Sequence, residues 1–174
     1  RHDDDPDFEN SGSGVPNYLG APVISPDGTS AWVPSKKDNV KRGTLRSGGN
    51  LNHQNTVRAI ASRVDLATNA ESYGSRVDFD NASMVSAAAF DPTGVFLFAA
   101  LETSREVAVV DAHNGAELFR FGVGRAPQGL AVSPDGTRLY VSNFMDRTVE
   151  ARDLTKLREQ GLFQAPVVAT AGTV

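Results

Sequence analysis

The sequence predicts an all-β chain built from three copies of one antiparallel unit. In each copy a short apolar run, a turn with proline and glycine, and a second apolar run follow one another; the turn prolines are Pro26, Pro92 and Pro134. A third strand that ends in aspartate comes next, at Asp65, Asp111 and Asp153. Pro92 and Pro134 are 42 residues apart, within the range of about 40–45 residues for a four-stranded propeller blade. A β-sandwich also has frequent turns, but it has no reason to keep such a period.

The turns justify the strand assignments in order. Ser25-Pro26-Asp27-Gly28 and Ser133-Pro134-Asp135-Gly136 each combine a proline that presets φ with a glycine that accepts positive φ. Asp91-Pro92-Thr93-Gly94 has the same form in the middle copy. Second strands are expected at 30–33, 95–100 and 138–142, and fourth strands at 116–121 and 166–169. Each strand-end aspartate is expected to bond the backbone two residues on.

The internal spacing identifies an insertion in the first copy. The turn proline and the strand-end aspartate are 19 residues apart in the second and third copies but 39 apart in the first. We therefore expect an acidic, flexible leader at 1–19, a blade at 20–83 with a 20-residue insertion at about 35–55, a regular blade at 84–124, and a regular blade with a closing strand at 125–174. Three blades are too few to close a ring, so the predicted fold is an incomplete β-propeller.

The insertion and one blade link are the candidate interaction sites. In a four-stranded blade the insertion, the second-to-third loops and the links between blades share one face. The candidate residues there are basic: Lys36, Lys37, Lys41, Arg42, Arg46, His53 and Arg125. Such a loop fits an acidic partner, an anionic ligand or a neighbouring domain; it also fits a solvated surface loop. Arg125 could hold an anion near the central channel or pair with a carboxylate.

The stretch Gly124 to Asn143, with Tyr140-Val141-Ser142-Asn143 at its end, closely resembles the YVTN-type β-propeller repeat. The third position of that tetrapeptide is serine here instead of threonine. Three further segments in combination, Pro22 to Gly28, the insertion through Asn55 to Arg58, and Gly161 to Val168, look like bacterial exported proteins in which such a propeller precedes a dihaem cytochrome-c-peroxidase-like domain. The resemblance implies a periplasmic or cell-surface location.

Composition narrows the chemistry. The chain has no cysteine, so thiolate metal sites and covalent c-type haem cannot form within it. No catalytic set, metal site or cofactor site is expected here. The charge pattern gives no reason to expect nucleic acid, and without a run of 18 or more apolar residues we expect no membrane span. We expect a non-catalytic scaffold or interaction module, a fragment of a larger exported protein, whose partners are further blades, another domain or copies of itself. The alternative is the propeller part of a dihaem peroxidase-like oxidoreductase with its redox centres elsewhere. A propeller lactonase or quinoprotein would need carboxylates and histidines that converge from several blades, and the sequence suggests no such set.

Overall fold

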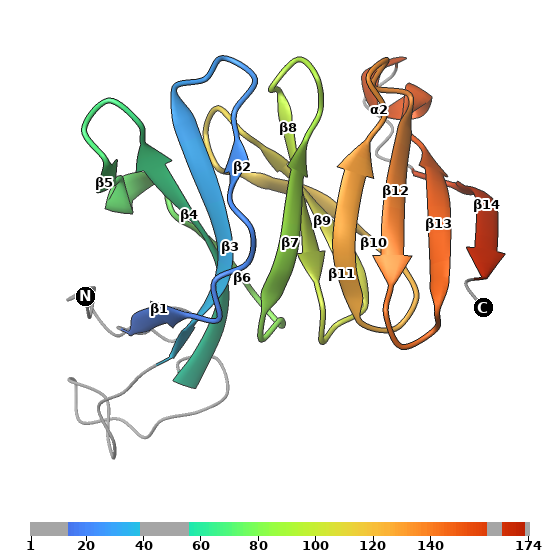
Figure 1. Ribbon diagram of the computed structural model, residues 1–174, viewed down its shortest axis with the longest axis horizontal. Coiled ribbons are helices and arrows are strands. Elements are labelled where there is room, and N and C mark those ends of the chain that lie inside the picture. Colours follow the sequence, from blue (N-terminus) through green and yellow to red (C-terminus); the bar gives the residue numbers. More distant parts are fainter. Residues whose placement is uncertain (1–13, 39–55, 160–164, 173–174) are drawn as a thin grey trace.

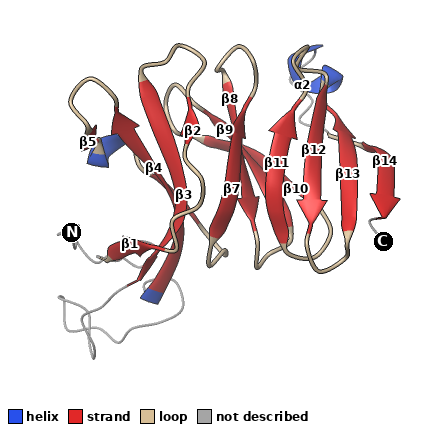
Figure 2. Cartoon of the chain, viewed as in Figure 1, coloured by secondary structure: helices blue, strands red, loops and turns tan. Residues whose placement is uncertain are grey.

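The computed structural model describes residues 14–38, 56–159 and 165–172, and it is an open β-propeller segment of three blades. Figure 1 shows the blades side by side in chain order, and Figure 2 shows that strands dominate. The predicted fold class is therefore confirmed.

The first blade is the irregular one. Its strands are β1 (Val15–Asn17), β2 (Val23–Ile24), β3 (Ser30–Asp38), β4 (Val57–Asp65), β5 (Ala70–Glu71) and β6 (Val77–Phe79), and η1 (Tyr73–Ser75) lies between the last two. Both β1 and β2 pair with β3, and both β5 and β6 pair with β4, so the inner and outer strands are each split in two. The sequence did not identify β1, β5 or β6, because each is too short to show a periodic pattern.

The second and third blades are regular, each with four antiparallel strands. The second contains β7 (Val85–Phe90), β8 (Phe96–Leu101), β9 (Glu106–Asp111) and β10 (Glu117–Gly122). The third contains β11 (Pro127–Val132), β12 (Arg138–Asn143), β13 (Thr148–Asp153) and β14 (Val167–Gly172), with the short helix α2 (Thr155–Glu159) before its last strand. Helix α2 was not predicted.

Turn chemistry sets the ends of the strands. Gly28, Gly94 and Gly136 have φ of 70°, 73° and 69°, a conformation that glycine adopts without steric cost. In the outer two copies a serine hydroxyl accepts the backbone N–H that opens the next strand; in the middle copy the Asp91 carboxylate accepts it from Phe96 at 2.7 Å. The predicted aspartate turns are confirmed, because Asp65, Asp111 and Asp153 each accept the N–H two residues on.

These two kinds of turn share one end of every blade, which we call the turn face. A backbone bond joins them in each copy: Leu66 to Thr29, Ala112 to Val95, and Leu154 to Thr137, at 2.9–3.0 Å. The opposite end, the loop face, contains the β8–β9 and β12–β13 turns and the β10–β11 link, and strand β3 ends and β4 begins there (Figure 1). This division agrees with the expected one.

Two apolar clusters hold the blades together. Trp32, Phe79, Leu97 and Leu101 belong to the cluster between the first and second blades. Phe98, Val107, Val109 and Leu139 belong to the cluster between the second and third. Strand faces are therefore covered in turn by the next blade.

The third blade leaves its outer face open in the described structure. Trp32, Phe98 and Tyr140 occupy the same place in their blades, two residues after the start of the second strand. The first two are fully buried, whereas Tyr140 is exposed. All of β14 is exposed as well. A further surface of the same kind would complete the burial of this face.

Candidate interaction surface

The predicted basic residues do not form one loop. Lys36 and Lys37 lie in β3, because its pairing with β4 continues to Asp38 opposite Val57. Lys41, Arg42, Arg46 and His53 lie outside the described residues. Only Arg125 lies on a described loop, the link between β10 and β11.

The two lysines have different surroundings. Lys37 is 1% exposed, and its Nζ lies 3.6 Å from a carboxylate oxygen of Asp78. Lys36 is partly exposed; its Nζ lies 3.1 Å from Asp38 and 4.5 Å from the ring centre of Tyr18. Lys37 thus contributes to the interior of the first blade, and Lys36 contributes to its inner surface.

Arg125 is fixed by an aspartate of the neighbouring turn. Its Nε lies 2.5 Å from Asp146 Oδ1, and its backbone N–H donates to Asp146 Oδ2 at 2.6 Å. The backbone hydrogen bond, and to a smaller extent the side-chain one, lowers the pKa of Asp146 below its usual value. The guanidinium remains half exposed. Of the two sequence-based possibilities for Arg125, the geometry shows pairing with a carboxylate.

A buried polar network supports this part of the loop face. Glu150 in β13 accepts hydrogen bonds from the Gly124 N–H at 2.8 Å and from Asn143 Nδ2 at 2.6 Å. Its other oxygen accepts from Arg152 Nη2 at 2.6 Å, and Arg152 also donates to the carbonyl of Gly122. Glu150 and Arg152 are each 8% exposed. The network ties the third blade to the link that holds Arg125.

The turn above the network exposes two large apolar side chains. Phe144 and Met145 are 65% and 64% exposed. Met145 borders a hollow of about 260 Å³ together with Arg105, Arg125 and Glu102. A second hollow, of about 520 Å³, lies beside Phe144, Met145 and Arg147. We call these five residues, Arg105, Arg125, Phe144, Met145 and Arg147, the loop-face patch.

The loop-face patch has the composition of a protein-binding surface. Arginine, methionine and aromatic residues are the types enriched where proteins meet. Two arginines are held in the left-handed backbone region, Arg105 at φ 60° and Arg147 at φ 54°, in matching turns of successive blades. The sequence pointed to Arg125 but missed Phe144 and Met145; their place in the turn that follows Asn143 could have marked them as exposed.

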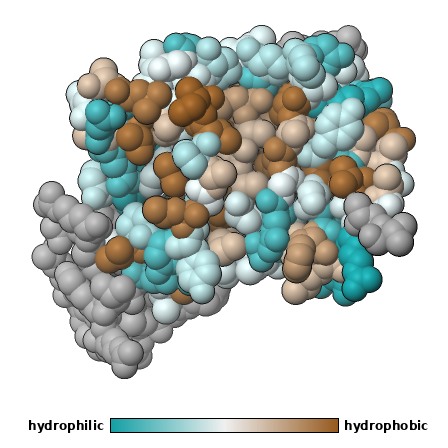
Figure 3. Space-filling model, viewed as in Figure 1, coloured by the Kyte–Doolittle hydropathy of each residue, from teal (hydrophilic) through white to brown (hydrophobic). Residues whose placement is uncertain are grey.

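Apolar side chains also gather on the face formed by the inner strands. Figure 3 shows hydrophobic residues over the middle of the molecule, where Figure 1 places β2, β7 and β11. Tyr18, Leu19 and Ile24 are exposed in the first blade. In a ring the inner strands of the blades surround the central channel, so this face is the channel wall.

The described residues contain neither a cluster of metal-ligating side chains nor a membrane-spanning helix. No group of three or more His, Cys, Asp or Glu side chains among them is placed to hold a metal ion. No helix in the described ranges is both long and apolar enough to cross a bilayer.

Similar proteins show the fold. No family model and no curated protein matches the chain. Hydrazine synthase of Kuenenia stuttgartiensis matches with a TM-score of 0.67 at 16% identity, over 80% of this chain and 46% of that one. The WD40 repeats of RRP9 match with a TM-score of 0.61 at 16% identity, over 89% and 38%. A putative 6-phosphogluconolactonase of Bacteroides fragilis matches with a TM-score of 0.54 at 16% identity, over 94% and 56%.

The chain thus spans 38–56% of the length of these three proteins. At this identity the likeness extends to the fold alone. The chain is structurally similar to part of a β-propeller.

Proposed function

We propose that the chain is a non-catalytic propeller scaffold that presents its loop-face patch to a protein partner. The observation that carries this proposal is the pair Phe144 and Met145, exposed on a turn whose base is fixed by the buried Glu150 network. Fixed, exposed apolar side chains bordered by arginines lose little entropy on binding, and they therefore suit a docking role.

The scaffold is proposed to pack against further blades as well. Tyr140 is exposed where Trp32 and Phe98 are buried by the next blade. Because the inter-blade clusters are apolar, an equivalent blade on this face would bury Tyr140 in the same way. These blades would come from a larger protein or from a second copy of the chain.

The finer parts of the proposal rest on sequence resemblance. They are a YVTN-type repeat, an exported bacterial parent, and a periplasmic or cell-surface location. In the alternative, a dihaem peroxidase-like oxidoreductase, the domain with the redox centres would itself be a partner of the loop face. Fractionation of cells that make the parent polypeptide tests the location, and its haem content tests the alternative.

A photo-crosslinking amino acid placed at position 145 tests the docking role. The same amino acid at position 113 on the turn face is the matched control. In an extract of cells that make the parent polypeptide, we expect a distinct crosslinked product from position 145 that Phe144→Ser and Arg125→Glu each weaken. Equal labelling from positions 145 and 113, or labelling that both substitutions leave unchanged, would contradict the proposal.

A further inference from the structure

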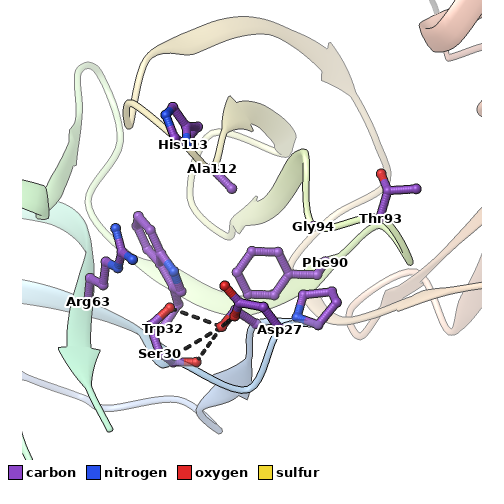
Figure 4. A pocket seen from close by; sticks show the side chains of 11 residues that line it. Asp27, Ser30, Trp32, Arg63, Phe90, Thr93, Gly94, Ala112 and His113 are labelled. Carbon is purple, nitrogen blue, oxygen red and sulfur yellow. Dashed lines mark hydrogen bonds between the residues drawn. The ribbon is translucent and has the colours of Figure 1, made fainter. Parts of the chain in front are cut away.

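A polar groove lies on the turn face, between the first and second blades. A cavity of about 150 Å³ is bordered by Asp27, Trp32, Arg63, Phe90 and His113. A second hollow, of about 240 Å³, shares Trp32, Arg63 and His113. The two spaces therefore form one groove around the indole of Trp32. Figure 4 shows Arg63 and Phe90 on either side of this ring, with His113 on the side away from Asp27.

Comparison of the copies shows that this groove is a departure from the repeat. Trp32 faces Arg63 across β3 and β4, and at the same place in the second blade Phe98 faces Val109. Likewise Ala112 follows its strand-end aspartate where the third blade has Leu154. At the second-to-third interface, Val109 and Leu154 belong to a closed apolar cluster.

Packing alone therefore does not explain Arg63. The fold is built with valine at the matching place, whereas Arg63 is charged and partly exposed, and its charge acts on the carboxylates of Asp27 and Asp65. The alanine in place of leucine also leaves open the space beside it. Both replacements have the same consequence, which is an open groove that contains a guanidinium group instead of a filled apolar one.

The groove offers hydrogen-bond donors that the described residues do not use. The Arg63 guanidinium makes no hydrogen bond or ion pair within the described ranges; its contact is with the face of Trp32, 6.0 Å from the ring centre. Neither Trp32 Nε1 nor the His113 ring is hydrogen-bonded to a described residue. By contrast, the Asp27 carboxylate already accepts bonds from Ser25 and Thr29. Unused donors beside satisfied acceptors favour a ligand that supplies acceptor oxygens.

The charges and shape narrow the ligand class. A guanidinium binds a carboxylate in two-point fashion, and an aromatic surface suits an apolar group next to it. The Asp27 carboxylate on the same cavity repels a doubly charged phosphate more strongly than a singly charged carboxylate. The hydrogen bond from the Ser25 hydroxyl is the largest of several that lower the pKa of Asp27. This carboxylate is therefore charged at neutral pH, and the repulsion is present there.

We propose that this groove binds a small carboxylate-bearing molecule. Arg63 holds the carboxylate, Trp32 Nε1 donates to it, and the edges of Trp32 and Phe90 contact the apolar part of the ligand. The site lies on the face opposite the loop-face patch, and it does not depend on the docking role proposed for that patch.

The single tryptophan of the chain makes the test direct. In a ¹H–¹⁵N spectrum of the whole 174-residue chain, the one indole N–H resonance reports on the groove. Acetate, phenylacetate, phosphate and chloride are titrated separately at constant ionic strength. We expect saturable shifts with the two carboxylates, with phenylacetate binding more tightly.

Substitutions separate the site from general charge effects. Arg63→Gln is expected to weaken carboxylate binding at least about tenfold, since it removes a charged two-point partner. Arg138→Gln is the matched control on the turn face of the third blade and should leave binding unchanged. The backbone resonances of Arg63→Gln verify that the variant is folded. If it does not fold, Arg63→Lys, which keeps the charge but not the fork, is expected to bind more weakly than the unsubstituted chain.

Four results would overturn the proposal. Equal shifts with chloride would mean that the resonance follows ionic conditions alone. Tighter binding of phosphate than of either carboxylate would refute the ligand class. Unchanged carboxylate affinity in the folded Arg63 variant would remove Arg63 from the site. The absence of any saturable shift at 100-fold molar excess and above, up to about 50 mM ligand, would refute a site of useful affinity.

Discussion

Replacement of Glu150 by glutamine is expected to destabilise the third blade strongly. The neutral side chain would leave the buried Arg152 guanidinium without its carboxylate partner, now 2.6 Å away. The glutamine amide would also turn a donor toward Arg152 or toward the Gly124 and Asn143 donors, so one acceptor position is lost in either orientation. Breaking a buried ion pair by removal of one partner costs about 3–5 kcal/mol. We expect a loss of that size in the free energy of unfolding.

Urea unfolding at one fixed protein concentration measures this loss. Circular dichroism follows all strands, whereas Trp32 fluorescence follows the interface of the first and second blades. Because each blade contacts only its neighbours, the strand signal of Glu150→Gln should fall before the tryptophan signal changes. The matched control is Glu117→Gln, whose pair with Arg120 is partly exposed and is expected to contribute about 0–1 kcal/mol. A loss for Glu150→Gln no larger than that of the control would refute the reasoning.

Three smaller predictions concern the turns. The pKa of Asp135 is lowered to about 2, mainly by the hydrogen bond from the Ser133 hydroxyl, so the stability that this carboxylate contributes is present above pH 3.8 and is lost as the pH falls through about 2. In acid titrations Asp135→Asn should therefore lose stability less steeply below pH 4 than the unsubstituted chain. Identical acid profiles of the two proteins would contradict this. Asp91→Ala should lower the free energy of unfolding, measured by thermal unfolding, by about 1–3 kcal/mol because the Phe96 N–H loses its acceptor. Asp91→Ser places the residue of the other two copies at this position and should lower it less. Equal losses in the two variants would count against the repeat alignment. Arg105→Asn should raise the free energy of unfolding by up to about 1 kcal/mol, since asparagine tolerates the φ of 60° better than arginine. A lower midpoint of thermal unfolding would show that the arginine side chain is needed there.

The blades could be predicted from the sequence because their signals are local. A proline–glycine turn, two apolar runs and a strand-end aspartate recur at fixed offsets, and each requires only neighbouring residues. The third strands of all three copies end where the aspartates predicted, at Asp65, Asp111 and Asp153. The placement of the insertion between β3 and β4 follows from the same offsets.

Features that depend on distant contacts were not visible. Lys36 and Lys37 fall within the predicted insertion at about 35–55, yet their backbone continues the ladder with β4. Helix α2 is only five residues long, too short for a periodic pattern. The bond between Glu150 and Gly124 joins residues 26 positions apart, and nothing in the local sequence marks it.

The two candidate sites differ in how much the sequence could show. The residues of the loop-face patch come from three different connections. The sequence could therefore predict only that these connections lie on the same face. The turn-face groove could have been suspected by aligning the copies, because Arg63 falls where the second blade has Val109. That alignment does not show that both replacements border the same cavity; this requires the packing of one blade on the next.

The central claim is that the described structure is an open three-blade segment with one exposed blade face. The association state of the 174-residue chain tests this claim most directly. Light scattering over a range of protein concentrations gives the mass of the species in solution. The exposed Tyr140 face and the exposed strand β14 predict self-association, with a mass above that of the 18.5 kDa chain that rises with concentration. A stable, monodisperse monomer across that range would contradict the claim.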